Sequence, residues 1–327
     1  MMLDQFSAVN ADRTTPWGTD NDSETLATSA EMLEIAGLAN WNVQLRPEYT
    51  LDHDGKVIPV PGRFATVTSS GQVLGSGLSS RYKVLQAEDA FGFGDAIVDS
   101  GEAKWSRAGR VRNGETIFGC MELSGLDIDV PGDGPIKPYL FIVNSFGGWT
   151  PYMGLLAYVR PRCINTFQMA YGTGTSHKFT IRHTGTLDGK LTMAREALGI
   201  AFRHNEQVAT VVNKLATTKV VDQQVQDIFK ALWPLSDEAS DSVKERSMFT
   251  KAWDNYQASE TLDGIRGTAW GALNAVTEVV DHLSNYRPVS DGIQAGDTQQ
   301  LRTLSTMLEQ GERRKEQALR QLVALSR

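Results

Sequence analysis

The side chains best suited to chemistry lie in an alternating stretch of the sequence, between positions 149 and 160. Tyr152, Tyr158 and Arg160 share one face of a predicted strand there, because strand residues two positions apart point the same way. Aromatic rings beside a guanidinium form either a binding surface or part of a core, and both remain open. The opposite face runs from Trp149 to Val159, is apolar, and is predicted to pack against a long helix that begins at residue 187.

A second polar group follows, where this strand is predicted to lead into a helix at residues 167–172. Arg162 and Asn165 lie at that junction. Backbone amides at a helix N-terminus attract anions, and neighbouring arginines add forked donors for phosphate. Asn165 is equally suited to cap the helix while the arginines pair with local acids. Phosphate binding and capping both remain open.

The charge of the chain is unevenly distributed. The formal net charge is −7, but residues 101–184 hold nine cations against six acids, so this segment carries +3 and the remainder −10. Such asymmetry permits a local basic surface on an acidic protein, although solvated strand faces give the same numbers. The composition therefore argues against a protein that coats nucleic acid by bulk charge.

Motifs for nucleotide or metal chemistry are missing from the sequence. No G-x-x-x-x-G-K-[ST] string occurs, and the five histidines show no ligand spacing. We therefore expect no cofactor. Cys163 lies among apolar neighbours, which favours a core residue over a nucleophile. Asp127 and Asp129 share a strand face and could hold Mg²⁺ in a nuclease, but exposed alternation beside a turn is the simpler account.

The elements that position these residues change from strands to helices along the chain. Alternation and glycine turns predict antiparallel hairpins, most clearly residues 104–111 and 116–123 around Asn113-Gly114. A long amphipathic helix is predicted over residues 187–215, with further helices behind it. The expected fold class is α+β, with an antiparallel, hairpin-rich sheet body backed by a long helix and followed by an α-helical C-terminal half.

The expected organisation has four parts. They are an irregular N-terminal segment with a short helix (1–40), a β-rich body (41–186), a helical region (187–286), and a loop with a C-terminal amphipathic helix (287–327). Residues 82–85 are predicted as a further strand, and 261–283 as one helix.

The location follows from what the sequence lacks. No run approaches the about 20 apolar residues of a membrane-spanning helix. The N-terminal residues show no signal pattern, and the two cysteines suggest no disulfide framework. We expect a cytoplasmic protein that does not contact a membrane.

An ordered set of short motifs resembles an uncharacterised family of phage and plasmid-like proteins. The motifs are Pro16-Trp17-Gly18, Ala36-Gly37-Leu38 with Trp41, Ser80-Arg81-Tyr82-Lys83-Val84 followed by Ala90-Phe91, and Arg162-Cys163-Ile164-Asn165-Thr166 before Arg182-His183-Thr184. The resemblance covers residues 15–215 and implies a phage or mobile-element origin, hence the host cytoplasm. It implies no activity and no catalytic residues.

The order of elements is also similar to that of phage and eukaryotic single-strand annealing recombination proteins. The similarity rests on Tyr82-Lys83-Val84 leading into 90–94, then the 104–123 hairpin, then the helix from Leu187. It implies a homo-oligomeric ring or filament with single-stranded DNA in a basic groove, and C-terminal helices that serve assembly or recruit a phage exonuclease or host single-strand-binding protein. The resemblance places arginines and lysine on phosphates and tyrosines on bases, and the junction asparagine is added to this set. The candidate residues are Lys104, Arg107, Arg110, Arg112, Tyr152, Tyr158, Arg160, Arg162 and Asn165.

These observations support three hypotheses of function. The leading one is a non-enzymatic, ATP-independent protein that binds and anneals single-stranded DNA in homologous recombination. The second is a phage or mobile-element protein that modulates a host enzyme through its helical half. The third is a magnesium-dependent nuclease that uses Asp127 and Asp129.

Overall fold

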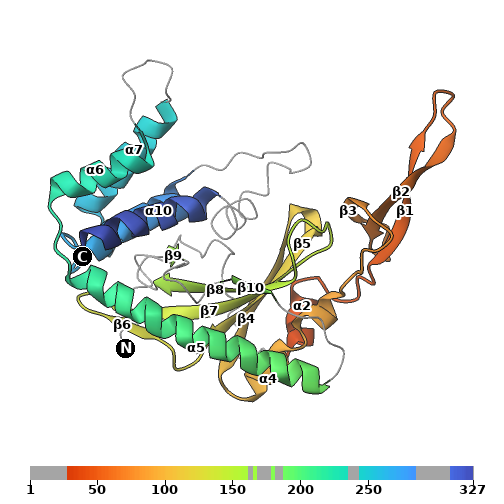
Figure 1. Cartoon of the computed structure of the whole chain (residues 1–327), viewed down its shortest axis with the longest axis horizontal. Coiled ribbons are helices and arrows are strands. Elements are labelled where there is room, and N and C mark those ends of the chain that lie inside the picture. The colour runs from red at the N-terminus through yellow and green to blue at the C-terminus, as the bar shows by residue number, and fades with distance from the viewer. Residues whose placement is uncertain are drawn as a thin grey trace.

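A computed structural model of the chain describes residues 28–160, 165–167, 178–180, 187–234, 243–284 and 310–326. In this part of the chain a seven-stranded sheet has the order β10-β8-β7-β5-β4, with β6 paired to β7 and β9 to β8, and a smaller sheet has the order β1-β2-β3. The longer helices follow the strands in the sequence, and those near the C-terminus gather at one end of the large sheet (Figure 1). The expected α+β class, with a hairpin-rich body and a helical second half, is confirmed.

The large sheet is antiparallel throughout. Its strands are Ala103–Val111 (β4), Thr116–Leu123 (β5), Ile128–Val130 (β6), Gly134–Ser145 (β7), Met153–Arg160 (β8), Asn165–Phe167 (β9) and Lys178–Thr180 (β10). Cys120, Phe141 and Leu155 lie side by side across β5, β7 and β8. The central strands are buried on both faces, so their sequences read as continuous apolar runs and not as alternating ones.

The long helix α5 (Leu187–Thr217) covers the face of this sheet that carries Leu140 and Leu156 (Figure 1). Ala194, Ala197 and Ala201 make the contact, and their small side chains let the helix approach closely. The prediction that the Trp149–Val159 face packs on this helix is therefore wrong, because Leu156 lies on the opposite face, with Tyr152 and Tyr158. Both faces are apolar, so periodicity alone could not choose between them.

The second half of α5 belongs to a different core. Val208, Val212 and Leu215 pack with the C-terminal helices, which are α6 (Asp222–Leu232), α7 (Val243–Ala258), α8 (Ala269–Glu278) and α10 (Gln310–Leu325). The single helix predicted over 261–283 is broken into a 3₁₀ turn η2 (Glu260–Leu262), α8 and a π-helical turn η3 (Val279–Leu283). Gly264 and Gly267 have φ of 91° and 79°, which ends any helix there before Thr268 caps α8.

The smaller sheet, made of β1 (Gln44–Leu51), β2 (Val57–Val67) and β3 (Val73–Leu78), projects from the opposite end of the body (Figure 1). Its base is fixed to the β7–β8 connection, since a Cβ on Gly75 would lie 2.5 Å from the Cα of Gly147. The Thr66 hydroxyl also donates to the Phe146 carbonyl at 2.9 Å. The short helices α2 (Ser29–Ile35), α3 (Ala87–Phe91) and α4 (Gly94–Asp99) complete the body.

Three local expectations are corrected by the structure. Residues 82–85 form no strand, and nearby the Gln86 side chain bonds to both the amide and the carbonyl of Val43 in place of a strand partner. Strand β8 begins at Met153 and not at residue 149. Asn165 lies in strand β9, opposite Arg160, and does not cap a helix there; residues 168–172 lie outside the described part. None of the described helices is both long and apolar enough to cross a bilayer.

Candidate nucleic-acid interface

The tip of the β4–β5 hairpin has an unusual backbone. Arg112 and Asn113 have φ of 52° and 55°, and Gly114 follows with 92°. Left-handed residues match the twist of a hairpin, but a non-glycine residue such as Arg112 is strained by about 1–2 kcal/mol there. The turn is closed by the Glu115 amide, which donates to the Arg112 carbonyl at 3.1 Å. The strained turn holds the Arg112 side chain against the β7–β8 connection.

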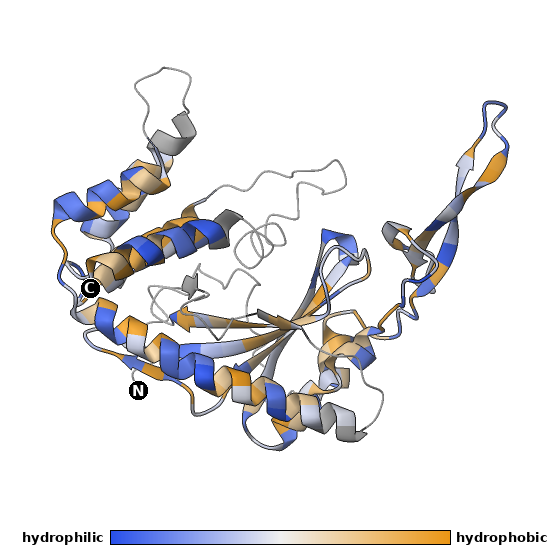
Figure 2. Cartoon of the chain, viewed as in Figure 1, coloured by the Kyte–Doolittle hydropathy of each residue, from blue (hydrophilic) through white to orange (hydrophobic). Residues whose placement is uncertain are grey.

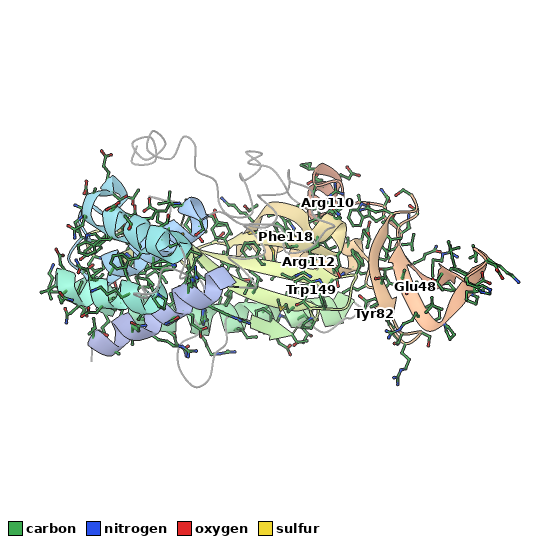
Figure 3. The ribbon with its side chains drawn as sticks, turned by 90° about the horizontal axis from the view of Figure 1, so that it is seen from above. Glu48, Tyr82, Arg110, Arg112, Phe118 and Trp149 are labelled. Atoms are coloured by element: carbon green, nitrogen blue, oxygen red, sulfur yellow. The ribbon has the colours of Figure 1, made fainter. Side chains whose placement is uncertain are left out.

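Two arginines at this tip each lie over a tryptophan ring. The Arg112 guanidinium is 4.3 Å from the centre of the Trp149 ring, and that of Arg110 is 5.9 Å from the centre of the Trp41 ring. Trp149 is 36% exposed and Arg110 is exposed, and Figure 3 shows them near one another at the base of the projecting sheet. Arg110 is exposed and Arg112 is half-buried, and cations stacked on indole rings combine positive charge with flat apolar surface.

Trp41 connects the two arginine–tryptophan pairs. Trp41 donates from its indole nitrogen to the Gly37 carbonyl at 2.9 Å, and its ring fills the space that a Cβ on Gly114 would occupy, at 2.7 Å. Its ring also contacts that of Phe146, with centroids 6.2 Å apart. Trp41 is therefore pinned against the same turn that carries Arg112.

One carboxylate lies inside this group. Glu115 is 3.9 Å from Arg112 and packs so closely on Gly147 that a Cβ there would clash with it. Burial raises the pKa of Glu115, and the positive charge of Arg112 offsets only part of this. Burial, and secondly the Glu115 charge, raise the pKa of Tyr82, whose hydroxyl donates to the Ser145 carbonyl at 2.6 Å. The protonation of the partly buried Glu115 therefore changes the net charge of this group of residues.

The structure brings together only some of the residues named from the sequence. Lys104 and Arg110 are exposed on β4, and Arg112 is half-buried at its end. The side chains of Arg107 and Asn165, and the whole of Arg162, lie outside the described part of the chain.

Tyr158 and Arg160 are corrections, because both are 1% exposed and cannot reach a nucleic acid where they lie. The Tyr158 ring packs 5.9 Å from that of His204 on α5, and burial raises its pKa. Tyr152 is half-buried and donates its hydroxyl to the Ala90 carbonyl, so it also serves the body of the protein. The stacking role expected for these two tyrosines is not supported by their positions.

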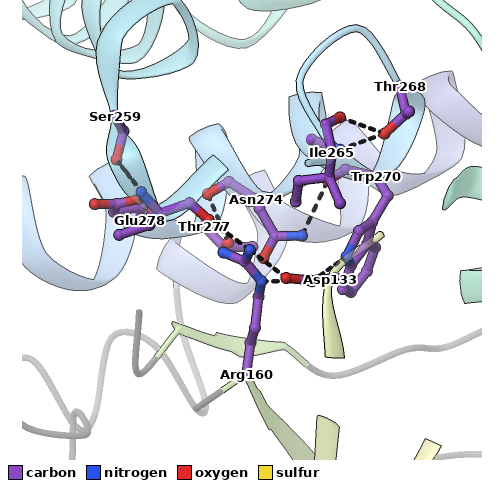
Figure 4. Close-up of polar contacts among 11 residues, drawn as sticks. Asp133, Arg160, Ser259, Ile265, Thr268, Trp270, Asn274, Thr277 and Glu278 are labelled. Carbon is purple, nitrogen blue, oxygen red and sulfur yellow. Dashed lines mark hydrogen bonds and ion pairs between the residues drawn. The ribbon is translucent and has the colours of Figure 1, made fainter. Parts of the chain in front are cut away.

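Arg160 belongs to a buried polar network between the sheet and the helices (Figure 4). Its Nε donates to Asp133 at 2.6 Å, and a terminal nitrogen donates to the Thr261 carbonyl at 2.5 Å. The Trp270 indole donates to the same Asp133 at 2.7 Å, and the Thr261 hydroxyl donates to Glu278 at 2.7 Å. This network joins the two halves of the molecule and leaves no face for a ligand on Arg160.

Trp41 and Trp149 were missed by reasoning from the sequence. Alternation assigned Trp149 to a strand face, whereas it lies in the connection before β8 and is partly exposed. A signal was present, since Trp149 directly follows Gly147-Gly148, where a chain reversal makes continued alternation unreliable.

The acidic pair offers little support for a metal site. Asp127 and Asp129 are exposed, and neighbouring Glu122 pairs with Lys137 at 2.7 Å. Burial raises the pKa of Asp127, and Lys137 opposes that shift. Within the described ranges, only Asp52, His53 and Asp54 bring three potential ligand atoms within 4.8 Å of one another. Cys120 is buried in the sheet and suits a core residue.

Comparison with known proteins gives a family and no activity. No curated protein and no solved structure matches the chain. The expectation of an uncharacterised family is confirmed, whereas an origin in a phage stays a prediction. Residues 74–305, most of the chain, match the family described as a domain of unknown function (DUF932), and the protein therefore belongs to that family.

Proposed function

We propose that this protein binds single-stranded DNA at the hairpin tip and anneals it without ATP. The observation that carries the proposal is the pairing of Arg110 with Trp41 and of Arg112 with Trp149 at one hairpin turn. We call these four residues the arginine–tryptophan cluster. It replaces the tyrosines as the expected stacking surface.

The chemistry of the cluster suits an unpaired strand. Guanidinium groups neutralise phosphates, and aromatic rings stack on bases with about 1–3 kcal/mol per base, whatever the base. Lys104, exposed on the same strand β4 as Arg110, adds a further cation. A cluster of this kind fits sequence-independent binding, in which bases of two strands remain free to pair.

Binding is tested by fluorescence anisotropy with a labelled single-stranded oligonucleotide. Replacing Arg110 and Arg112 with alanine is expected to weaken binding and to lower the slope of log affinity against log salt by about 1.4, at about 0.7 per lost phosphate contact. Arg320→Ala is the matched control, because Arg320 is a 73% exposed arginine on α10, in the helical half. Unchanged affinity and slope in the double variant would sink the proposal.

Annealing is tested separately from binding. Two complementary oligonucleotides, labelled as an energy-transfer pair, are mixed with protein in the absence of nucleotide. We expect faster pairing than in buffer, and a loss of this acceleration in the double arginine variant. A protein that binds the strands and slows their pairing would be a strand-protecting protein and not an annealing one.

A second candidate function is docking to another protein. Tryptophan and arginine also dominate the energetically important residues of protein interfaces, so the same cluster suits a protein partner. Purified protein that is free of nucleic acid and carries a stoichiometric host protein would favour this alternative. The nuclease hypothesis stays a prediction, tested by magnesium-dependent digestion and its loss in Asp129→Ala.

A further inference from the structure

The outer part of the β1–β2 hairpin, residues 49–59, exposes apolar side chains to an unusual degree; we call it the arm. Tyr49, Leu51 and Val57 are 60%, 63% and 62% exposed. The register pairs Tyr49 with Pro59 and Leu51 with Val57, so these four side chains share one face of the ribbon. Figure 2 shows apolar colouring on this projecting hairpin, away from the core. Exposed apolar residues gathered on one face mark an interaction surface.

Prolines in the arm and just below it interrupt the edges of the hairpin and disfavour pairing with another strand. Pro59 and Pro61 lie on β2 and Pro47 lies on β1, and none of them has an amide to donate. Strand β3 pairs with β2 only from Phe64 to Val67, so the outer ribbon has two open edges. A partner is therefore expected to pack on the face of the arm and not to extend its sheet.

Charge along the hairpin is divided between its two ends. Asp52 and Asp54 lie at the tip together with one exposed cation, Lys56, so the tip carries a formal charge of −1. Arg46 and Arg63 are exposed at the root, where Arg63 donates to the Gly77 carbonyl at 2.7 Å. Glu48 is also near the root, where it accepts a hydrogen bond from the Gly77 amide, so the root carries a formal charge of +1. The order is thus an acidic tip, an apolar middle and a basic root.

We propose that the arm docks on the arm of a second copy of this chain, antiparallel to it, in a two-fold dimer. A surface with opposite charges at its two ends and an apolar centre is complementary to itself when rotated by two-fold symmetry. Each acidic tip then meets the partner's basic root, and the Tyr49–Leu51–Val57 faces pack on each other. Stable interfaces bury about 800 Å² per partner, so the roots must take part as well as the arms. The proposal does not depend on nucleic-acid binding.

The apolar contact is tested by sedimentation of the full chain over a range of concentrations. We expect a dimer whose dissociation constant rises about tenfold or more in Leu51→Thr with Val57→Thr. Ile58→Thr is the matched control, because Ile58 is 37% exposed on the opposite face of the same ribbon. Circular dichroism checks that each variant is folded. A folded monomer at every concentration, or a dimer equally affected by both variants, would overturn the proposal.

The charge pattern allows a sharper experiment. Asp54→Arg and Arg46→Glu are each expected to weaken self-association, because each places like charges at both tip–root contacts. Mixing the two variants is expected to restore a dimer that contains one chain of each, since both contacts are then between opposite charges. Dimers of one variant that are as stable as the parent, or a mixture that stays monomeric, would contradict the antiparallel arrangement. A stable complex with another protein in place of the dimer would also contradict it.

Discussion

An arginine, a carboxylate and a tryptophan meet at two places in this molecule, with opposite consequences. Arg160, Asp133 and Trp270 form a buried trio at the junction between sheet and helices (Figure 4). Arg112, Glu115 and Trp149 form a surface trio at the hairpin tip. The arginine and carboxylate side chains of the buried trio are 1% and 2% exposed, and those of the surface trio are 34% and 24% exposed.

The two trios differ in how the tryptophan is used. In the buried trio the Trp270 N–H points at the carboxylate, at 2.7 Å, so the ring edge satisfies a charge. In the surface trio the face of the Trp149 ring lies under the guanidinium, at 4.3 Å. Its carboxylate is 3.9 Å from the arginine, at the limit of an ion pair. A closed set of hydrogen bonds fixes structure, whereas a cation stacked on a ring is an arrangement that ligand-binding surfaces also use.

The largest expected difference between the trios is in stability. Asp133→Ala leaves the Arg160 charge and the Trp270 N–H without their acceptor in the interior, and should lower the free energy of unfolding by about 3–5 kcal/mol. Glu115→Ala should change it by less than about 1 kcal/mol, because this ion pair is only partly buried and its charges are 3.9 Å apart. Urea unfolding of both variants measures the two values. Equal losses of unfolding free energy in the two variants would show that burial does not determine how much each carboxylate contributes to stability.

The next prediction measures how much the hydrogen bond from the tryptophan N–H contributes to stability. Trp270→Phe keeps most of the ring but removes a hydrogen bond to a buried charge, so we expect a loss of about 1.5–3 kcal/mol in the free energy of unfolding. Trp149→Phe removes no described hydrogen bond to Glu115 and keeps a ring beneath Arg112, so its stability should match the parent. Thermal and urea unfolding compare the pair. A similar loss in both would mean that ring packing, and not the N–H, stabilises Trp270.

A third effect concerns affinity. Trp149→Ala removes one exposed stacking surface and, under the proposed function, should weaken oligonucleotide binding by about 1–3 kcal/mol, or about 5- to 150-fold. Trp149→Phe should retain most of the affinity. Anisotropy titrations at one fixed salt concentration give both values. If Trp149→Ala binds as well as the parent, the ring does not stack on bases.

The smallest effect is a pH dependence of the surface trio. Burial raises the pKa of Glu115 above its ordinary value of 4.5, so this carboxyl takes up a proton earlier as the pH falls. The Arg112 charge then loses its counter-charge, and oligonucleotide affinity should rise by less than about fivefold. The free energy of unfolding should also rise as the pH falls toward 4.5. The reason is that Glu115 binds its proton more tightly in the folded state than in the unfolded state.

Glu115→Gln is the matched variant for this effect. It should bind with higher affinity at neutral pH and lose this part of the pH dependence. Titrations between pH 4.5 and 7 compare it with the parent. A parent whose affinity falls as the pH falls would reverse the assigned sign.

Local patterns predicted the parts of the fold that local physics decides. The β4–β5 hairpin follows from Asn113-Gly114 between alternating runs, and α5 follows from its amphipathic spacing. The exposure of Arg110 at the hairpin follows from the same alternation. The uneven charge pointed to residues 101–184, but it could not tell which arginines of that segment reach the surface.

The fate of Arg160 could not be predicted from the sequence because its partners are distant. Alternation places it on a face with Tyr158, but its burial depends on Thr261, which is 101 residues away. The prediction for Trp149 was wrong for the opposite reason, since a local turn places this residue before the strand and not in it. Periodicity describes a strand, whereas the covering of its faces is decided by elements elsewhere in the chain.

The buried trio also sets an order of events during synthesis. Asp133 and Trp270 are 137 residues apart, and a ribosome adds about 5–20 residues per second, so about 7–27 s pass before the indole can reach the carboxylate. In that interval the sheet body must leave the ribosome with Asp133 and Arg160 already made but lacking the helices that bury them. An ion pair remains stably hydrated in water until the helices are made and cover it. An apolar surface at the same junction would instead promote aggregation during that interval.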